Sequence, residues 1–284
     1  RPHQQANLPP QDLDAEESVL GAMLVSSNAI SIVAEVLRPE DFYRRTHGLI
    51  YETIRAMYAE GDAVDSITVI NGLQQRGILE EVGGKAVSNT LASVEPLASA
   101  PILGRVFHEI FGMRRETAET MRGFAKQGRA RFQEWPANLS YSEAPHTLYS
   151  LHPDAVRAIV AEAQGITALH LSEHAAERAF LHDGSGPFAE FLKARNVSES
   201  DWPPPALSPV AYGSHLGVIR PGVLCVHLAN ATREELSVVA AAKAPVVLCP
   251  RSNLFIELKL PPLYDMLELG MEPALGTDSL ASNT

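Results

Sequence analysis

Two histidines and two carboxylates stand just after short apolar runs of the sequence, and their types suit metal-assisted catalysis. His170 and Glu173 follow the first run, His227 follows the second and Asp278 follows the third, at residues 166–169, 223–226 and 274–277. Imidazole and carboxylate groups are the usual ligands of a catalytic divalent metal. A glutamate three residues beyond such a ligand is placed to transfer protons rather than to bind the metal.

The apolar runs also predict the elements that hold these side chains. Short, continuous apolar runs are typical of parallel strands that are buried on both faces. In a (β/α)8 barrel the catalytic residues lie at the carboxyl ends of such strands. The sequence therefore predicts a barrel whose active site contains His170, Glu173, His227 and Asp278.

Six short segments after Ala86 support this prediction by their order and spacing. They are Val106–Gly112, Ala144–Ser150, Leu169–Glu173, Val226–Leu228, Cys249–Asn253 and Gly276–Ser279. Together they resemble the amidohydrolase superfamily, in particular its branch of deaminases and chlorohydrolase-like enzymes. The resemblance implies a hydrolase that acts on carbon–nitrogen bonds other than peptide bonds. Its small-molecule substrate would be an aminated heterocycle or a nucleoside-like compound, from which ammonia is released.

The same resemblance implies a role for each matching residue. His170 corresponds to the metal-binding histidine at the end of the fifth barrel strand. Asp278 corresponds to the metal-binding aspartate after the eighth strand, which also takes a proton from the attacking water. Glu173 corresponds to the general acid/base that carries protons to the substrate ring, and His227 to the histidine that orients and polarises the water. His146 corresponds to a histidine that contacts the substrate, and the implied metal is zinc, with iron as the alternative.

One feature of the family is missing, the His-x-His pair that ends the first barrel strand and supplies two further metal ligands. None of the ten histidines in the sequence lies two residues from another. The resemblance thus provides two of the four expected protein ligands, His170 and Asp278. Because a metal site needs its full ligand set, we expect weak metal binding and impaired catalysis.

Residues 8–85 carry a second set of motifs, which differ in kind from those of the barrel. The motifs are Leu8–Leu24, Leu37–Tyr43, His47–Tyr51, Val64–Val69 and Gly77–Gly84. They resemble the N-terminal domain of DnaB-like replicative helicases. The resemblance implies a small helical collar that helps to assemble a ring, contacts primase or loader partners and carries no chemistry. A homo-oligomer, or a complex with a replication protein, is therefore expected to form through residues 8–85.

The local spacing of apolar residues predicts four helices in this part of the chain. The four groups are Val19, Leu20, Met23 and Leu24; Ile30, Val33, Ala34 and Leu37; Leu49, Ile50, Ile54 and Met57; and Val69, Ile70 and Leu73. Asp12 or Asp14 can cap the first helix. Pro39, Gly61 and Gly77 follow the other three helices, where residues that end a helix are expected. Nothing in this part has the pattern of a strand.

Two features of the sequence exclude function classes that a helicase-like part would suggest. The phosphate-binding motif Gly-x-x-x-x-Gly-Lys-Ser/Thr does not occur, because the single Gly-Lys pair, Gly84-Lys85, is followed by Ala86. These residues alone therefore do not form an ATP-driven helicase. The net charge is −11, and acidic residues outnumber basic ones on both sides of the junction. Direct binding of nucleic acid is therefore not expected.

The expected location of the chain is the cytoplasm. No run of about 18 apolar residues is present, and no charged segment followed by an apolar core opens the chain. Neither a membrane span nor a secretion signal is therefore expected. Cys225 and Cys249 lie in apolar runs, which predicts small buried thiols in a reducing compartment rather than a disulfide.

The predicted architecture is a helical part followed by an α/β part. Residues 1–85 are expected to form a small helical bundle, and residues 86–284 to form about strands three to eight of an incomplete (β/α)8 barrel. Such a barrel has two exposed sheet edges. Three interpretations of function remain open. They are a metal-dependent deaminase-type hydrolase with impaired activity, a helicase-collar interaction module without ATPase activity, and a chimeric chain without one evolved function.

Overall fold

The chain separates into two compact units, Arg1–Val87 and Ser88–Thr284. The computed structural model describes residues 12–25, 27–62, 64, 66–78, 82, 91, 93–130, 132–193 and 203–279. The domain boundary predicted between residues 85 and 86 lies outside these described residues. Each unit has a hydrophobic core of its own.

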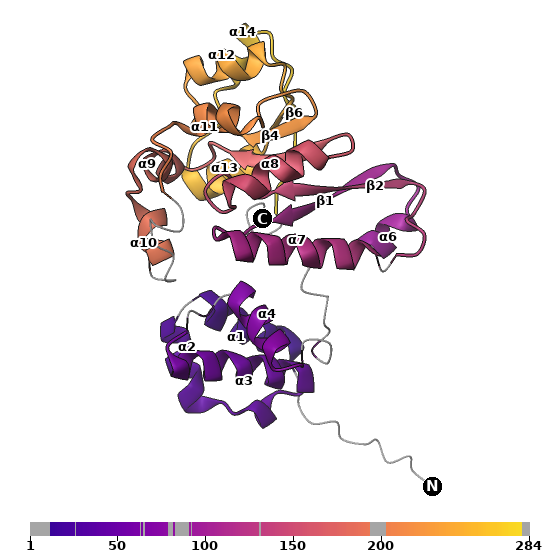
Figure 1. The fold of residues 1–284 in the computed structure, drawn as a ribbon, viewed down its shortest axis with the longest axis vertical. Coiled ribbons are helices and arrows are strands. Elements are labelled where there is room, and N and C mark those ends of the chain that lie inside the picture. Colours follow the sequence, from indigo (N-terminus) through magenta and orange to yellow (C-terminus); the bar gives the residue numbers. More distant parts are fainter. Residues whose placement is uncertain are drawn as a thin grey trace. The chain divides into compact units, whose positions relative to one another are not determined.

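Helices build the described part of the first unit (Figure 1). They are α1 (Leu13–Val25), α2 (Ser27–Val36), the 3-10 helix η1 (Pro39–Asp41), α3 (Arg45–Glu60) and α4 (Ser66–Gln75). Asp12 caps α1, because its Oδ1 accepts a hydrogen bond from the backbone N–H of Ala15 at 3.0 Å. Gly61 ends α3 in the left-handed conformation, with φ of 79°. The four helices predicted from apolar spacing are confirmed, and the described residues of this unit include no strand.

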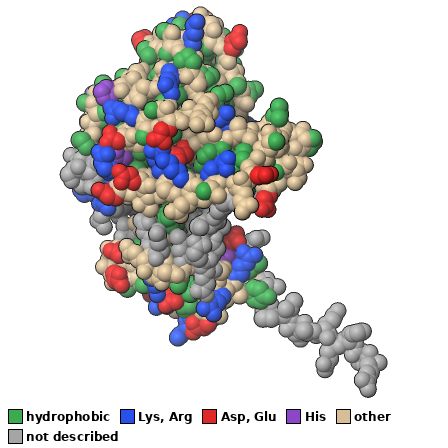
Figure 2. Space-filling model, turned by 45° about the vertical axis from the view of Figure 1, so that its right-hand side comes forward, with side chains coloured by type: hydrophobic (Ala, Val, Ile, Leu, Met, Phe, Trp, Pro, Cys, Tyr) green, Lys and Arg blue, Asp and Glu red, His purple; other side chains and the backbone are tan. Residues whose placement is uncertain are grey.

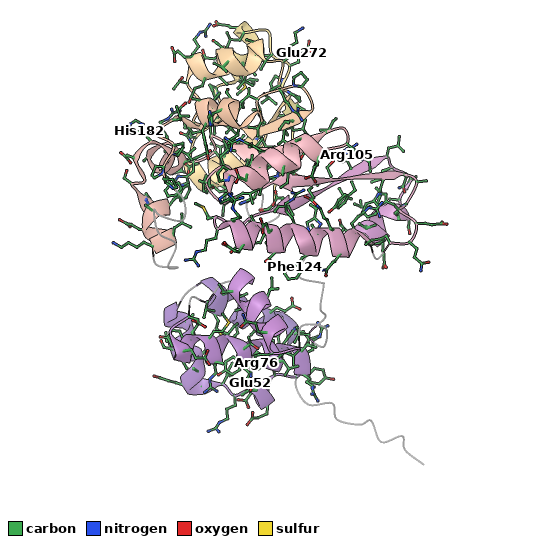
Figure 3. The ribbon with its side chains drawn as sticks, viewed as in Figure 1. Glu52, Arg76, Arg105, Phe124, His182 and Glu272 are labelled. Carbon is green, nitrogen blue, oxygen red and sulfur yellow. The ribbon has the colours of Figure 1, made fainter. Side chains whose placement is uncertain are left out.

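The apolar positions of these helices form the core of the first unit. Eight side chains are buried together: Leu20, Met23, Ile30, Phe42, Tyr51, Ile54, Val69 and Leu73. Tyr51 and Ile54 are completely buried, so α3 is the central helix of the bundle. At the surface, Glu52 and Arg76 lie beside each other and form an ion pair of 3.3 Å (Figure 3). Exposed pairs of this kind contribute little to stability.

The second unit contains parallel strands in barrel order. Its described strands are β1 (Gly104–Ile110), β2 (Leu139–Pro145), β3 (Thr167–Leu171), β4 (Val223–His227), β5 (Val246–Leu248) and β6 (Ala274–Leu275). β1 pairs with β2, and β3 to β6 form a second sheet in chain order, with every pairing parallel. A single parallel bridge between Thr147 and His170 links the two sheets. The predicted fold class, a helical bundle followed by an incomplete (β/α)8 barrel, is confirmed.

Helices connect and cover the strands of the second unit (Figure 1). They are α6 (Val94–Ala98), α7 (Arg115–Ala130), α8 (Pro153–Glu162), α9 (Ala175–Asp183), α10 (Pro187–Lys193), α11 (Pro209–Leu216), α12 (Arg233–Ala241), α13 (Pro250–Glu257) and α14 (Leu263–Glu268). In β3, Thr167, Leu169 and Leu171 are buried, whereas Ala168 and His170 between them are half-buried. One face of this strand is therefore fully covered, and the other is open enough to hold a functional side chain.

The surface of the second unit carries charges of both signs. Figure 2 shows Lys and Arg side chains interspersed with Asp and Glu side chains on the displayed face. A nucleic-acid interface would instead gather basic side chains in one stripe or patch.

None of the helices in the described ranges is long and apolar enough to cross a membrane. Cys225 and Cys249 are both buried and unpaired, as predicted.

One ion-pair network ties α7 to the sheet and to α8. Arg122 Nε donates to Glu143 Oε2 at 2.7 Å, and its Nη2 donates to Glu162 Oε2 at 2.7 Å. The side chains of Arg122 and Glu143 are each only 13% exposed. We expect Arg122→Met to lower the free energy of unfolding by about 3–5 kcal/mol, because it leaves the Glu143 carboxylate buried without its partner.

Urea denaturation followed by tryptophan fluorescence measures this effect. Both tryptophans, Trp135 and Trp202, belong to the second unit, so the signal reports on that unit. The matched control is Arg115→Met, which breaks an exposed pair with Asp154 and is expected to cost less than about 1 kcal/mol. Equal losses in the two variants would contradict a structural role for the Arg122 pair.

Candidate active site

The predicted site residues lie at the carboxyl ends of neighbouring strands. His170 is the penultimate residue of β3, and His227 is the last residue of β4. His146 directly follows β2, and Asp278 lies three residues beyond β6. Because the strands are parallel, their carboxyl ends lie at one edge of the barrel, where barrel enzymes place their active sites.

His170 is the centre of the cluster. Its Nδ1 lies 3.0 Å from His227 Nε2, and its Nε2 lies 2.8 Å from Glu109 Oε1. The rings of His170 and His227 are stacked, with centroids 5.1 Å apart. The ring of His146 meets that of His170 edge-on, with centroids 5.3 Å apart. Four side chains from four strands or strand ends therefore converge on one place.

The electrostatics of Glu173 and His227 suit proton transfer. Glu173 Oε1 lies 3.4 Å from His227 Nε2. Burial raises the pKa of Glu173 to about 7, an effect that the charge of His170 opposes and those of Asp278 and Glu257 reinforce. Burial and then the neighbouring His170 lower the pKa of His227 to about 4. A neutral imidazole thus lies beside a carboxyl group whose pKa is close to neutral pH, a combination common at catalytic sites.

Asp278 is near the cluster but has a different hydrogen-bond partner. Its Oδ2 accepts a hydrogen bond from Ser252 Oγ on α13 at 2.5 Å. Burial raises the pKa of Asp278, but the bond from Ser252 and the charges of His227 and His170 outweigh this effect, so that the net shift is downward. Asp278 is therefore ionised at neutral pH.

Backbone strain is concentrated at the same strand ends. Four non-glycine residues there have positive φ: Ser172 at 51°, His227 at 79°, Leu228 at 52° and Asp278 at 61°. Such conformations are uncommon outside glycine. Each costs about 1–3 kcal/mol, and they gather at functional sites, where the surrounding structure holds them. The strained turns after β3, β4 and β6 are thus consistent with a functional edge.

Two groups of side chains have the composition of a metal site. Glu109, His146 and His170 form one, and His170, Glu173 and His227 form the other, with donor atoms within 4.8 Å of one another in each. Two imidazoles and one carboxylate are a known ligand set of catalytic zinc. These donors therefore fit a divalent cation. Within the described residues, the predicted ligand His170 belongs to both groups, whereas the predicted ligand Asp278 belongs to neither.

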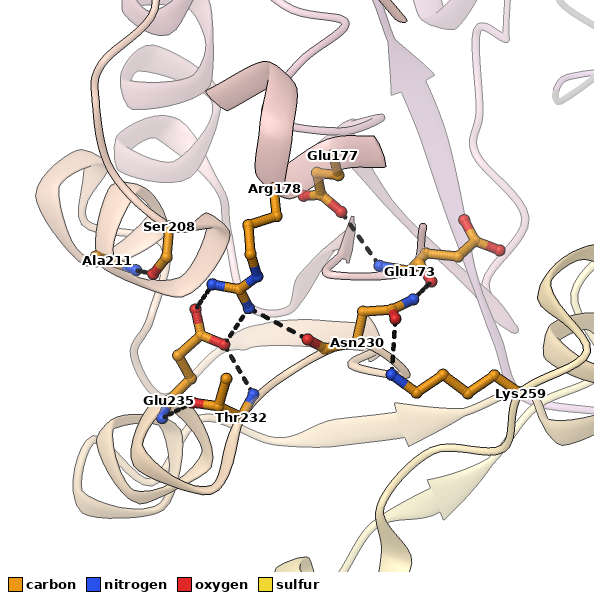
Figure 4. A network of polar contacts seen from close by, with 9 residues as sticks. All are labelled: Glu173, Glu177, Arg178, Ser208, Ala211, Asn230, Thr232, Glu235 and Lys259. Carbon is orange, nitrogen blue, oxygen red and sulfur yellow. Dashed lines mark hydrogen bonds and ion pairs between the residues drawn. The ribbon is translucent and has the colours of Figure 1, made fainter. Parts of the chain in front are cut away.

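A hydrogen-bond network fixes the backbone of Glu173 (Figure 4). Its N–H donates to Glu177 Oε2 at 3.1 Å, and its carbonyl oxygen accepts from Asn230 Nδ2 at 2.5 Å. Lys259 Nζ donates to Asn230 Oδ1 at 2.7 Å, and Arg178 Nη2 donates to the Asn230 carbonyl oxygen at 3.2 Å. The backbone of Glu173 is therefore held by the side chains of Glu177 and Asn230, and Lys259 and Arg178 in turn hold Asn230.

Four residues of the site had no role in the sequence prediction: Glu109, Glu177, Ser252 and Asn253. Three of them, Glu109, Ser252 and Asn253, occur within the motifs that resemble the amidohydrolases. Glu109 is the penultimate residue of β1, and its position near a strand end was the signal by which the sequence could have indicated it as a site residue. Glu177 is completely buried, and burial raises its pKa to about 8. Only the folded structure shows that its carboxylate meets the N–H of Glu173.

Comparison with known proteins agrees with the fold. The model of the Amidohydrolase family matches residues 89–284. The chain belongs to the amidohydrolase family. A relative from Deinococcus radiodurans, an aminodeoxyfutalosine deaminase, is 29% identical over 238 residues, which cover 75% of this chain and 57% of the relative.

Solved structures show the same amidohydrolase fold. Helicobacter pylori aminofutalosine deaminase has a TM-score of 0.60 at 18% identity, over 78% of this chain and 59% of that one. Guanine deaminase from C. acetobutylicum has a TM-score of 0.53 at 16% identity, over 70% of this chain and 45% of that one. At these identities the likeness concerns the fold alone.

The first unit has a different set of relatives. The model of the DnaB-like helicase N terminal domain matches residues 8–101. The replicative DNA helicase DnaB of Mycobacterium leprae is 47% identical over 91 residues, which are 32% of this chain and 15% of that helicase. Both family matches include residues 89–101. The chain therefore spans a small part of the helicase and a little over half of the deaminase from Deinococcus.

Proposed function

We propose that the second unit is a metal-dependent hydrolase that deaminates an aminated heterocycle or a nucleoside-like compound. The observation that supports this most directly is the cluster of Glu173, His170 and His227 at the strand ends of an amidohydrolase barrel. In that cluster a carboxyl group with a pKa of about 7 faces an imidazole that is neutral at the same pH. This pairing suits a reaction that must both remove and deliver protons.

The residues divide the proton transfers between them. His170 and Asp278 are the proposed cation ligands, and a bound divalent cation would lower the pKa of a water molecule enough to supply hydroxide near neutral pH. Asp278 accepts a proton from the attacking water, and neutral His227 holds that water by a hydrogen bond. Glu173 donates its proton to the ring nitrogen as the water oxygen adds to the neighbouring carbon. His146 contacts the substrate.

The second half of the reaction restores the protons. The proton held by Asp278 passes to the amino group, the carbon–nitrogen bond breaks, and ammonia leaves. The hydroxyl proton of the product returns to Glu173, so the ring carbon becomes a carbonyl. Zinc is the proposed cation, with iron as the alternative. Because the His-x-His pair does not occur in the sequence, we expect weak cation binding and slow turnover.

The first experiment is elemental analysis of the purified chain, with His170→Ala as control. Zinc or iron at up to about one ion per chain, lost in the variant, would support the proposed site; because binding is expected to be weak, the analysis is repeated after incubation with added Zn²⁺. Ammonia release is then screened with adenine-type nucleosides, guanine, triazines and futalosine-like compounds. A chain that binds no metal and releases no ammonia from any of these compounds would contradict the proposal.

The rate of ammonia release should depend on pH in a specific way. Burial holds the pKa of Glu173 at about 7, so its proton-donating form is lost as the pH rises above that value. Asp278 has a lowered pKa and stays ionised throughout the neutral range. We therefore expect kcat/KM to fall by about tenfold per pH unit above pH 7. A profile measured from about pH 6 to pH 9 that stays flat would remove Glu173 as the proton donor.

The first unit supports a second function, that of an interaction module. Its sequence similarity to a replicative helicase and its all-helical described fold favour self-assembly or binding of a replication partner. Ile32 and Val36 lie one turn apart on α2 and are 56% and 74% exposed. Light scattering coupled to size exclusion tests this proposal, with the double variant Ile32→Asp and Val36→Asp expected to lower the measured mass. If the unaltered chain is already a monomer, and the double variant has the same mass, self-assembly is excluded.

A further inference from the structure

The turn after β2 contains a chain of hydrogen bonds that ends at the ring of His146. The backbone N–H of Tyr149 donates to Thr147 Oγ1 at 3.3 Å, and the Thr147 hydroxyl donates to Ser150 Oγ at 2.7 Å. Ser150 Oγ in turn lies 3.0 Å from His146 Nδ1. Neither hydroxyl takes part in the proposed proton transfers, so their arrangement beside the substrate-contacting histidine needs another explanation.

The backbone of this turn is anchored on two sides. The carbonyl oxygen of His146 accepts a hydrogen bond from the N–H of His170 at 3.0 Å, which ties the turn to β3. The carbonyl oxygen of Ser150 accepts one at 2.7 Å from the N–H of Gly112, just beyond β1. Thr147 is only 2% exposed. The two hydroxyl groups are therefore held in place relative to the His146 ring.

The direction of the chain follows from what each group can donate. A backbone N–H can only donate, whereas a hydroxyl has one proton and two acceptor lone pairs. Ser150 Oγ receives the Thr147 proton, so its own proton is left for His146 Nδ1. If Nδ1 carried a proton instead, the Ser150 proton would lack an acceptor within the described residues. The first direction uses every proton of the chain, as protein hydrogen-bond networks generally do.

This direction decides which nitrogen of His146 meets a substrate. A neutral imidazole that accepts a hydrogen bond at Nδ1 carries its single proton on Nε2. Within the described residues, His146 Nε2 makes no hydrogen bond of its own. We propose that Thr147 and Ser150 are positioning residues that hold His146 as a hydrogen-bond donor at Nε2. The role of His146 as a substrate contact rests on the proposed function, whereas the position of its proton does not.

The assignment narrows the substrate class. In the proposed reaction Glu173 donates a proton to the ring nitrogen beside the reacting carbon, and His146 donates a second hydrogen bond. The substrate therefore needs two acceptors, one in the reacting amidine-like group and one elsewhere. A sugar hydroxyl, a ring carbonyl or a second ring nitrogen meets this requirement. Compounds without the second acceptor should be poor substrates, because a site built to hydrogen-bond a substrate group rejects analogues that lack it.

Nuclear magnetic resonance of the full chain with ¹⁵N-labelled histidine rings tests the assignment without a substrate. At about pH 8 most imidazoles are neutral, and long-range ¹H–¹⁵N correlations show which nitrogen of each ring carries the proton. His146→Gln identifies the signals of His146. We expect a proton on Nε2, and an Nδ1 signal that shifts in Ser150→Ala and in Thr147→Val because the hydroxyl chain is broken.

Two further variants serve as controls for this measurement. Thr147→Ser keeps the hydroxyl and should leave the Nδ1 signal of His146 in place. Ser237→Ala removes an exposed serine hydroxyl on α12 that bonds a backbone carbonyl, and it should also leave that signal unchanged. Circular dichroism confirms that each variant is folded.

Steady-state ammonia release gives a second readout. Ser150→Ala is expected to raise KM by about three- to tenfold, the usual contribution of one hydrogen bond. The value of kcat should change little, because His146 holds the substrate equally in the ground state and in the transition state. A merely structural defect would instead reduce the amount of active protein, and therefore the apparent kcat, without raising KM.

The outcomes separate this inference from the proposed function. A proton on His146 Nδ1 in the unaltered chain overturns the inference, even if ammonia is released and the proposed function stands. An Nε2 proton with an Nδ1 signal that does not move in Ser150→Ala or Thr147→Val also overturns it, because the hydroxyls then have no positioning role. The expected proton position and shifts, in a chain that releases no ammonia, support the positioning role and remove the proposed function.

Discussion

Replacing Glu173 with Gln is expected to lower the kcat/KM of ammonia release by about 10²- to 10⁴-fold, the usual contribution of a general acid or base. The amide has nearly the same size and keeps one hydrogen-bonding oxygen, but it cannot deliver a proton to the substrate ring. The backbone of residue 173 is held by Glu177 and Asn230, so the turn should keep its conformation. The loss should therefore fall on kcat, with KM little changed.

Steady-state ammonia release with the best substrate of the screen measures this effect. Glu190→Gln, an exposed glutamate on α10, is the control and should retain full activity. Cation binding should also persist in Glu173→Gln, because the proposed ligands are other residues. A variant at position 173 that keeps more than a third of the normal rate would assign the proton transfers to a different group.

The strand ends could be predicted from the sequence because each carries its own signal. His170 and His227 end apolar runs, and these runs are β3 and β4 almost to the residue. Strand β3 continues one residue past His170, to Leu171. The apolar run ends before His170 and therefore does not show where the strand ends. The four helices of the first unit could also be predicted from local signals, namely the spacing of apolar residues and end residues such as Gly61.

The contacts across the site could not be predicted in the same way. Glu109 and His170 are 61 residues apart in the chain, and only the pairing of β1, β2 and β3 brings them together. The hydroxyl that bonds Asp278 comes from Ser252 on α13, an element placed by packing against the barrel. Spacing along one strand or helix carries no information about these partners.

One aromatic side chain, Tyr51, lies in the centre of the core of the helical unit. Tyr51 is completely buried, its ring centroid lies 5.1 Å from that of Phe42, and the guanidinium of Arg55 lies over its ring. Its hydroxyl donates a hydrogen bond to the carbonyl oxygen of Leu37 at 2.5 Å. Tyr51 thus joins α3 to the segment between α2 and η1, and it fills the centre of a small core.

Tyr51→Ala is therefore expected to lower the free energy of unfolding of this unit by about 3–5 kcal/mol, as for other buried aromatic residues. Total stabilities of small domains are about 5–15 kcal/mol, so the variant should lose a large share of the unit's stability. Tyr51→Phe keeps the ring and loses only the hydrogen bond to Leu37, which should cost about 1–2 kcal/mol. Hydrogen exchange of peptides from residues 13–75 separates the two variants, because the Ala variant should lose protection throughout α3 and the Phe variant should keep most of it. Similar protection in both would mean that the apolar side chains around Tyr51 close the core without its ring.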